Sequence, residues 1–211
     1  PRFVPKRAAY EFLRSREEWV RSKIAELHLR HSAEPQRPAL RWDDSDSIPL
    51  HGVETPVTVV PARLARPRVR FDAGLFPRVE IYCAPATRTP AQLGATLRAA
   101  LRDLARQQAQ RLLEEEAARL GVGFSGPRIA DQKSLWGSCT PQGAISLNWR
   151  LVLAPPEVFR YVVVHELCHR VHLDHSRQFW ALVVRQMPDS GHWRNWLRQQ
   201  GASLHAVLPR R

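Results

Sequence analysis

The sequence predicts an α+β fold from three stretches of the chain. Leucines recur at helical spacing after Thr89, and the apolar stretch YVVVHELCH, which contains His165, has the composition of a buried helix. Between Ile48 and Cys83, short runs of β-branched residues are separated by prolines, which is typical of short strands. Helical and strand patterns therefore both occur, and we expect an α+β protein.

The first part of the chain is expected to form a helix followed by a loop. The helix runs from about Arg7 to Leu29, and the segment from His31 to Pro38, which is polar and contains two prolines, is predicted to be a loop or linker. The apolar stripe of this helix consists of Leu13, Val20, Ile24 and Leu27.

Three short strands are predicted next, and we expect them to form an antiparallel sheet. They are centred on Thr58–Val60, Val69–Phe71 and Val79–Ile81. With the first helix, these strands make up an expected N-terminal region, 1–88. The remainder, 89–211, is the expected catalytic region, and one continuous domain is the alternative.

A long helix opens the second region. Thr89 and Pro90 form an N-cap and first-turn pair, and Gly121 predicts the end of the helix after about Leu120. Its expected apolar face consists of Leu93, Leu97, Leu101, Leu104 and Leu112. The acidic run Glu114–Glu116 is interpreted as a solvated turn, because consecutive residues cannot converge on one point of a helix face.

The rest of the chain alternates between strands and helices. A strand near Arg128–Asp131 and a turn at Pro141–Gly143 precede a strand predicted for Ala144–Leu153. That strand is expected to lead straight into a helix that starts at Pro155-Pro156-Glu157. Two further helices are predicted, Ser176–Met187 and about Gly191–Gln200, with packing residues Phe179, Trp180, Val183, Trp193 and Leu197.

The sequence HELCH at residues 165–169 is an HExxH motif. Residues four apart on a helix lie on one face, so the imidazoles of His165 and His169 can close on a single metal ion. The carboxylate of Glu166 can then take a proton from a water whose pKa the ion lowers to about 7. A metal also offsets the cost of burying an unpaired carboxylate in an apolar helix. The motif therefore predicts a zinc hydrolase, and imidazole ligands favour zinc among the common ions.

A catalytic zinc site needs a third protein ligand, and His172 and His175 compete for that position. His172 would lie about 10 Å along an unbroken helix from His165, whereas His175 follows a point where the chain can turn back. Geometry therefore favours His175. Asp174 and Ser176 are possible orienting partners for a ligand ring, and Ser176 is equally an N-cap for the following helix.

The stretch from Asp131 to Val183 resembles the YgjP-like metallopeptidase-type family. The similarity lies in the WGSC element, the SLNWRL strand, the APPE helix start, and the HELxH motif followed by HS and FW. More weakly, FLRSREEWVRSKIAEL at residues 12–27 resembles the N-terminal helix of the family. Against the family pattern the chain starts late, after an expected basic pair of strands.

The resemblance implies a zincin-like metallopeptidase fold, in which a small antiparallel sheet packs against the HExxH helix. It implies that His165, His169 and His175 bind one zinc ion and that Glu166 is the catalytic acid/base. In zincin-type proteases a sheet edge beside the metal holds the substrate as an added strand. The short connection from the strand Ala144–Leu153 to the HExxH helix would put that strand where it could do this. Asn148, Arg150, Gln132 and Ser138 are possible donors to the oxyanion, although a structural role is the simpler interpretation of each.

Hydrolysis of extended polypeptide is the leading functional hypothesis. Some members of the family are described as UTP pyrophosphatases, so nucleotide pyrophosphohydrolysis is an alternative, although the sequence has no glycine-rich phosphate-binding loop. A third hypothesis is a metal-stabilised module that binds nucleic acid or ribosomes and hydrolyses nothing.

Composition bounds the possible partners of the 211-residue chain. With 32 Lys and Arg against 20 Asp and Glu, the net charge of +12 attracts anions, but the basic residues are scattered and not gathered into a nucleic-acid-binding stripe. No apolar run approaches the about 20 residues that span a bilayer, so no membrane partner is expected. Three cysteines, Cys83, Cys139 and Cys168, lack disulfide-framework spacing, which favours a reducing cytoplasm. Cys168 is interpreted as a core residue and not as a ligand.

Overall fold

The computed structural model describes residues 10–11, 14–19, 21–22 and 37–209. The chain divides into two compact units, Pro1–Gln36 and Arg37–Arg211, so the boundary expected at residue 88 falls inside the second unit. In the first unit the described residues are helical apart from a turn at Arg16. The predicted bounds of that helix, its apolar stripe and residues 31–36 lie outside the described residues.

The second unit begins with a four-stranded sheet. Its strands are β1 (Asp46–Leu50), β2 (Val53–Pro61), β3 (Arg68–Asp72) and β4 (Arg78–Cys83), in the order β1-β2-β4-β3. The prediction of a purely antiparallel sheet is wrong, because β2 and β4 are parallel. After β2 the segment 62–67 skips one strand position, so that β3 lies at the edge of the sheet. Strand β4 then fills the position between β2 and β3. Periodicity marks strands but does not specify their partners.

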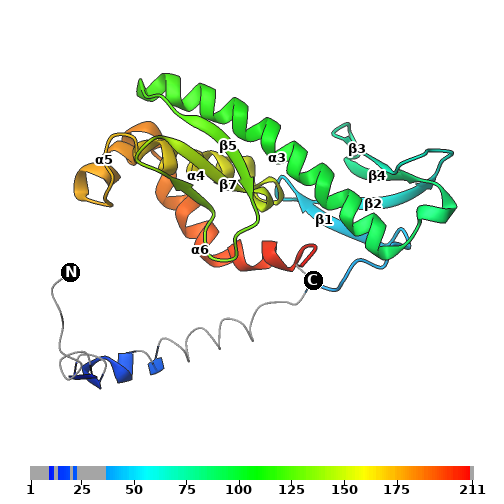
Figure 1. Cartoon of the computed structure of the whole chain (residues 1–211), viewed down its shortest axis with the longest axis horizontal. Helices are drawn as coiled ribbons and strands as arrows, with labels where there is room; N and C mark the ends of the chain where they lie inside the picture. Colours follow the sequence, from blue (N-terminus) through cyan, green and yellow to red (C-terminus); the bar gives the residue numbers. More distant parts are fainter. Residues whose placement is uncertain (1–9, 12–13, 20, 23–36, 210–211) are drawn as a thin grey trace. The chain divides into compact units, whose positions relative to one another are not determined.

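The long helix α3 (Pro90–Leu120) has both predicted ends. The hydroxyl of Thr89 accepts a hydrogen bond from the Gln92 backbone N–H (3.3 Å), and Gly121 ends the helix in the left-handed region with φ of 67°. The helix extends along both sheets of the unit (Figure 1). Its buried face includes Ala105, Ala109 and Leu113, whereas the predicted Leu104 and Leu112 are only partly buried.

The second sheet has three short strands, β5 (Ser125–Ala130), β6 (Gly137–Cys139) and β7 (Ala144–Asn148), in the order β5-β7-β6. It is mixed, not antiparallel as expected, because β5 and β7 are parallel. The strand predicted to reach Leu153 ends at Asn148, and Trp149–Leu153 forms a buried 3-10 helix, η2. The Asn148 side chain accepts a hydrogen bond from the Arg150 N–H (3.1 Å), which caps this turn. An apolar run alone does not separate a buried strand from a buried helix.

Three helices complete the unit: α4 (Pro156–Cys168), α5 (Arg177–Gln186) and α6 (Ser190–Ala206). As predicted, α4 starts after Pro155 and Ser176 caps α5, but α6 continues past Gln200 to Ala206. The α+β class is therefore confirmed. Among the described helices, none is both long enough and apolar enough to cross a membrane.

A buried carboxylate links three of these helices. Glu116 on α3 is fully buried, and it accepts hydrogen bonds from Arg119 (2.7 Å), Arg160 on α4 (2.7 Å) and Gln186 on α5 (2.8 Å). The interpretation of Glu114–Glu116 as a solvated turn is thus wrong for Glu116. Successive residues point in different directions around a helix, so one of three can face inward while its neighbours stay exposed.

Candidate metal centre

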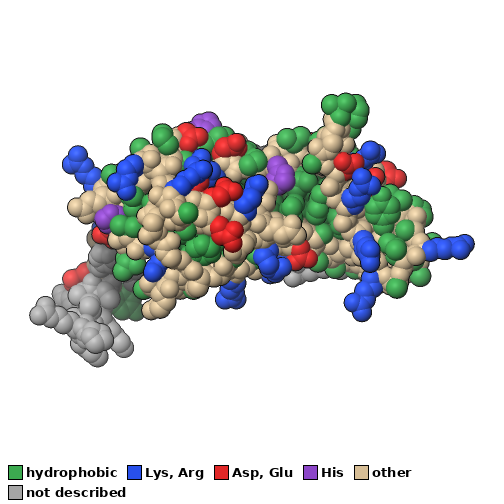
Figure 2. Space-filling view, turned by 90° about the horizontal axis from the view of Figure 1, so that it is seen from above, with side chains coloured by type: hydrophobic (Ala, Val, Ile, Leu, Met, Phe, Trp, Pro, Cys, Tyr) green, Lys and Arg blue, Asp and Glu red, His purple; other side chains and the backbone are tan. Residues whose placement is uncertain are grey.

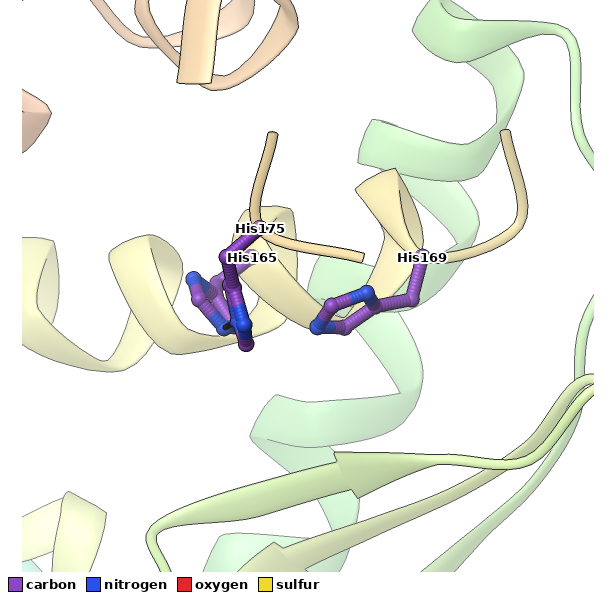
Figure 3. A group of neighbouring side chains, drawn as sticks. All are labelled: His165, His169 and His175. Carbon is purple, nitrogen blue, oxygen red and sulfur yellow. Dashed lines mark hydrogen bonds between the residues drawn. The ribbon is translucent and has the colours of Figure 1, made fainter. Parts of the chain in front are cut away.

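Three histidines converge at the end of α4 (Figure 3). His165 lies on the last turn of α4, His169 follows its last residue with helical φ and ψ of −66° and −13°, and His175 comes from the loop before α5. The backbone N–H groups of Val171 and His172 both donate to the Cys168 carbonyl, which turns the chain back. One ligand-capable atom of each histidine lies within 4.8 Å of the others, so the structure brings together the three predicted metal ligands.

The ring orientations fit a metal ion. The Nε2 atoms of His165 and His175 lie 3.1 Å apart, close to the about 3.4 Å that separates two nitrogens bound to one tetrahedral zinc. The Nδ1 atom of His169 is 3.0 Å from the carbonyl oxygen of His172. A hydrogen bond donated by Nδ1 fixes the ring tautomer and leaves Nε2 free for a metal. The backbone carbonyl of His172 thus contacts the site, whereas its ring is not among the three that converge.

An aromatic wall supports the three imidazoles. The ring of Phe179 stacks on His169 with centroids 4.6 Å apart and meets His165 and His175 edge-on. Trp180 stacks on His175 with centroids 5.7 Å apart. Both rings come from α5, whose first turn is fixed by the Ser176 hydroxyl as it accepts the Phe179 N–H (3.4 Å). The predicted packing roles of Phe179 and Trp180 are confirmed.

Two of the three imidazoles, those of His165 and His169, are held in the neutral form that binds metals. Burial, followed by the charges of His169, His175 and Arg194, lowers the pKa of His165 to about 3. Burial also lowers the pKa of His169, and the hydrogen bond to His172 opposes this shift. Because metal ligands must be unprotonated, these shifts leave the site ready to bind a cation near neutral pH.

Glu166 lies beside the histidines in the core, with only 6% of its surface exposed. Burial raises the pKa of its carboxyl to about 7. The carboxyl group lies against Gly137 of β6, where an added β-carbon would stand 2.6 Å from the oxygen Oε1. The backbone of β6 therefore passes directly over Glu166, and only glycine leaves enough room.

The strand beside the site is β6, an edge strand. Among the described residues it pairs only with β7, so its other edge has no strand partner. The sequence pointed instead to the strand after Gly143, but β7 occupies the centre of the sheet and cannot accept another strand. Gly137, Ser138 and Cys139 are all half-buried, so β6 is partly open to solvent.

The four candidate oxyanion donors divide into two groups. Asn148 donates from Nδ2 to the carbonyls of Gln132 (2.7 Å) and Leu135 (3.3 Å), and the buried Arg150 binds Asp131 and the Leu208 carbonyl. Both side chains thus have structural partners. Ser138 lies in β6, and the Gln132 oxygen Oε1 is buried without a hydrogen-bond partner among the described residues.

Other residues near the motif have simpler roles. Cys168 is a core residue as predicted, and burial raises the pKa of its thiol to about 12. Asp174 accepts a hydrogen bond from the Ser176 N–H (3.4 Å) and has no bond to a ligand ring among the described contacts. Gly137 and Arg194 were missed by the sequence reasoning. The WGSC element contained Gly137, but no local pattern distinguishes Arg194.

Comparisons with known proteins assign the chain to a family. The crystal structure of the metallopeptidase zymogen of Pyrococcus abyssi abylysin is 25% identical, over 44% of this chain and 95% of that chain, with a TM-score of 0.39. Among curated proteins, none matches the sequence. The family model for the YgjP-like metallopeptidase domain matches residues 1–200. With a small sheet packed on the HExxH helix, the α+β fold is of the zincin-like type, and the chain belongs to the YgjP-like metallopeptidase family.

Proposed function

We propose that the protein is a zinc-dependent peptidase that hydrolyses extended polypeptides. In this proposal His165, His169 and His175 hold one zinc ion, and Glu166 is the general acid/base. One observation carries it: three imidazoles that offer nitrogens to one point lie beside a buried carboxylate and a free strand edge.

Three protein ligands leave one position of a tetrahedral ion open for chemistry. A divalent cation in such a site polarises the scissile carbonyl and lowers the pKa of a coordinated water to about 7. Neutral imidazoles suit zinc better than the oxygen-preferring ions magnesium and calcium. The fixed tautomer of His169 and the aromatic support from Phe179 keep these ligands in place before any ion arrives.

Glu166 is suited to move the proton that hydrolysis requires. A carboxylate beside a metal-bound water can accept a proton from that water and return it to the leaving amine. In the metal-free site burial raises the pKa of the Glu166 carboxyl group to about 7. Its burial beneath β6 restricts both its rotation and its access to bulk water. Gly137 is therefore a positioning residue for Glu166.

The free edge of β6 favours polypeptide as the substrate. An extended peptide can add to a strand edge through main-chain hydrogen bonds, and this would place its carbonyls beside Glu166 and the histidines. A nucleotide has no peptide backbone and therefore cannot pair with a strand edge in this way. The basic side chains are spread over the surface with acidic ones among them, as one face shows in Figure 2, and this distribution does not define a nucleic-acid stripe.

The test uses one catalytic variant and one matched control. Glu166→Gln keeps the size of the side chain but cannot accept a proton, so it should abolish cleavage of an unfolded polypeptide while zinc content stays at one ion per chain. Glu157→Gln, an exposed acid on the first turn of the same helix, should cleave normally. Cleavage by Glu166→Gln at the wild-type rate would contradict the proposal. Pyrophosphate release from UTP without peptide cleavage would favour the nucleotide alternative.

A further inference from the structure

Arg194 places a positive charge next to the candidate metal centre. It lies on the exposed side of α6, and its guanidinium carbon is 4.1 Å from the centroid of the Trp180 ring. That ring stacks on His175 and lies 5.6 Å from the His165 ring. A single aromatic side chain therefore connects the guanidinium to two of the three histidines.

The charge of Arg194 has no acidic partner within the described part of the chain. None of the ion pairs or hydrogen bonds there involves its guanidinium, and the nearby Asp189 binds the Trp193 indole N–H instead (2.6 Å). A contact over a ring face leaves the N–H donors of the guanidinium available. Arg194 thus offers several unused donors.

The charge of Arg194 lies close to the three imidazoles. The Trp180 ring contacts its guanidinium on one side of this arrangement and the rings of His165 and His175 on the other. The Glu166 carboxylate carries one negative charge and neutral imidazoles carry none. Together they do not balance the positive charges of a divalent cation and Arg194. The site therefore has an excess of positive charge that a substrate anion can balance.

We propose that Arg194 binds a carboxylate of the polypeptide substrate close to the scissile bond. This inference rests on the proposed peptidase function and names its substrate class: peptides with a negative charge near the cleaved bond. The planar guanidinium, held over Trp180, presents paired N–H groups that match the two oxygens of a carboxylate. The carboxylate comes either from an acidic side chain or from the C-terminus of the peptide.

Four peptides of one cleavable sequence separate the two sources. They are an amidated peptide with Asn near the scissile bond, the same peptide with Asp, and each of these two with a free C-terminal carboxylate. The wild-type protein should cleave peptides with the recognised carboxylate roughly 10- to 100-fold faster in kcat/KM than the neutral peptide, the range expected for a hydrogen bond to a charged group. The peptide whose kcat/KM exceeds that of the neutral peptide identifies the source of the carboxylate.

Variants of Arg194 test whether this preference belongs to its charge. Arg194→Met keeps an aliphatic chain over Trp180 but removes the charge, so the ratio of charged to neutral substrate should fall to about one, and Arg194→Lys should retain part of it. Arg198→Met, one turn further along α6, should leave the ratio unchanged, because Arg198 bonds only Asn195 in the described contacts. A binding readout comes from fluorescence anisotropy with uncleaved peptides and Glu166→Gln, with and without Arg194→Met.

The outcomes distinguish this inference from the proposed function. If the wild-type protein cleaves all four peptides equally, or if Arg194→Met slows all four by one factor, Arg194 acts only through Trp180 and the carboxylate assignment is overturned. If the wild-type protein cleaves none of the four peptides but hydrolyses a nucleotide, both the carboxylate assignment and the proposed peptidase function fail. A preference that is present in both cleavage and binding, and that Arg194→Met removes from both, supports the assignment.

Discussion

Gly137 lies directly against Glu166: a β-carbon at position 137 would stand 2.6 Å from the carboxyl oxygen Oε1 and 2.7 Å from Cγ. Both distances are well inside van der Waals contact. Strand β6 and the carboxyl group therefore fit together only because the strand has a glycine at this point. The edge proposed to hold the substrate thus also sets the position of the proposed base.

Substitution of this glycine should separate catalysis from folding. In Gly137→Ala the new methyl group displaces the Glu166 carboxyl group, and kcat should fall about 100-fold, the cost of a catalytic group misplaced by about 1 Å. Zinc content and circular dichroism should stay at wild-type values. Gly191→Ala, where an added β-carbon meets nothing within 4 Å, serves as the control. Wild-type kcat in Gly137→Ala would show that the position of Glu166 does not limit the reaction.

The choice of His175 over His172 can be tested by metal content. His175→Ala removes a proposed ligand, so zinc affinity should fall by more than the 10- to 100-fold that loss of an outer partner of a ligand costs. His172→Ala removes only the ring and keeps the carbonyl that contacts His169, so it should bind zinc almost as the wild-type protein does. Competition with a zinc-sensitive dye measures both affinities. The reverse order of affinities would assign the third ligand to His172.

Burial of Glu166 predicts a pH dependence of stability in chelator-treated protein. Its pKa in the folded state, about 7, lies above the ordinary value of 4.5, so the folded state binds more protons between these pH values. Stability from this group is therefore present below pH 4.5 and is lost as the pH rises through 7. The full loss amounts to about 3 kcal/mol.

Comparison with Glu166→Gln isolates this effect, since His165 acts in the opposite direction. The low folded-state pKa of His165, about 3, costs stability as the pH falls below 6.5, and this applies to both proteins. Relative to Glu166→Gln, the wild-type protein should lose stability in urea unfolding between pH 5 and pH 8. A constant difference across this range would show that the folded state does not raise the pKa of Glu166.

Removal of the buried Glu116 carboxyl group should lower the free energy of unfolding more than removal of the carboxyl group of its neighbour Glu115. Glu116→Ala removes the buried acceptor of hydrogen bonds from Arg160 and Gln186, and loss of one hydrogen bond to a charged group costs about 1.5–3 kcal/mol. Glu115→Ala breaks only a loose, exposed pair with Arg111, which is worth less than about 1 kcal/mol. Urea unfolding of both variants measures the contrast. Similar losses in the two variants would mean that Glu116 does not link α3, α4 and α5.

Much of the fold and the core of the site could be predicted, because their signals are local. Thr89, Pro90 and Gly121 mark the ends of α3, and the spacing from His165 to His169 fixes a shared helix face. The structure brings His175 next to His165 and His169 because the chain turns back after Cys168, at the point where the sequence allowed a turn.

The parts that sequence reasoning missed depend on contacts between distant segments. The order of β2, β3 and β4 follows from a crossover that no periodicity records. Whether Glu116 is solvated or buried depends on Arg160 and Gln186, far along the chain. In the same way, Gly137 meets Glu166 and Arg194 meets Trp180 only after the helices and sheet have packed together.

The most direct test of the central claim is a zinc titration of chelator-treated protein, with peptide cleavage measured at each step. The cleavage rate should be negligible without metal, rise in proportion to added zinc and saturate at one ion per chain. Glu166→Gln should take up the same single ion with no gain in rate. Cleavage that is independent of zinc, or that continues in zinc-loaded Glu166→Gln, would contradict a three-histidine zinc site in which Glu166 moves the proton.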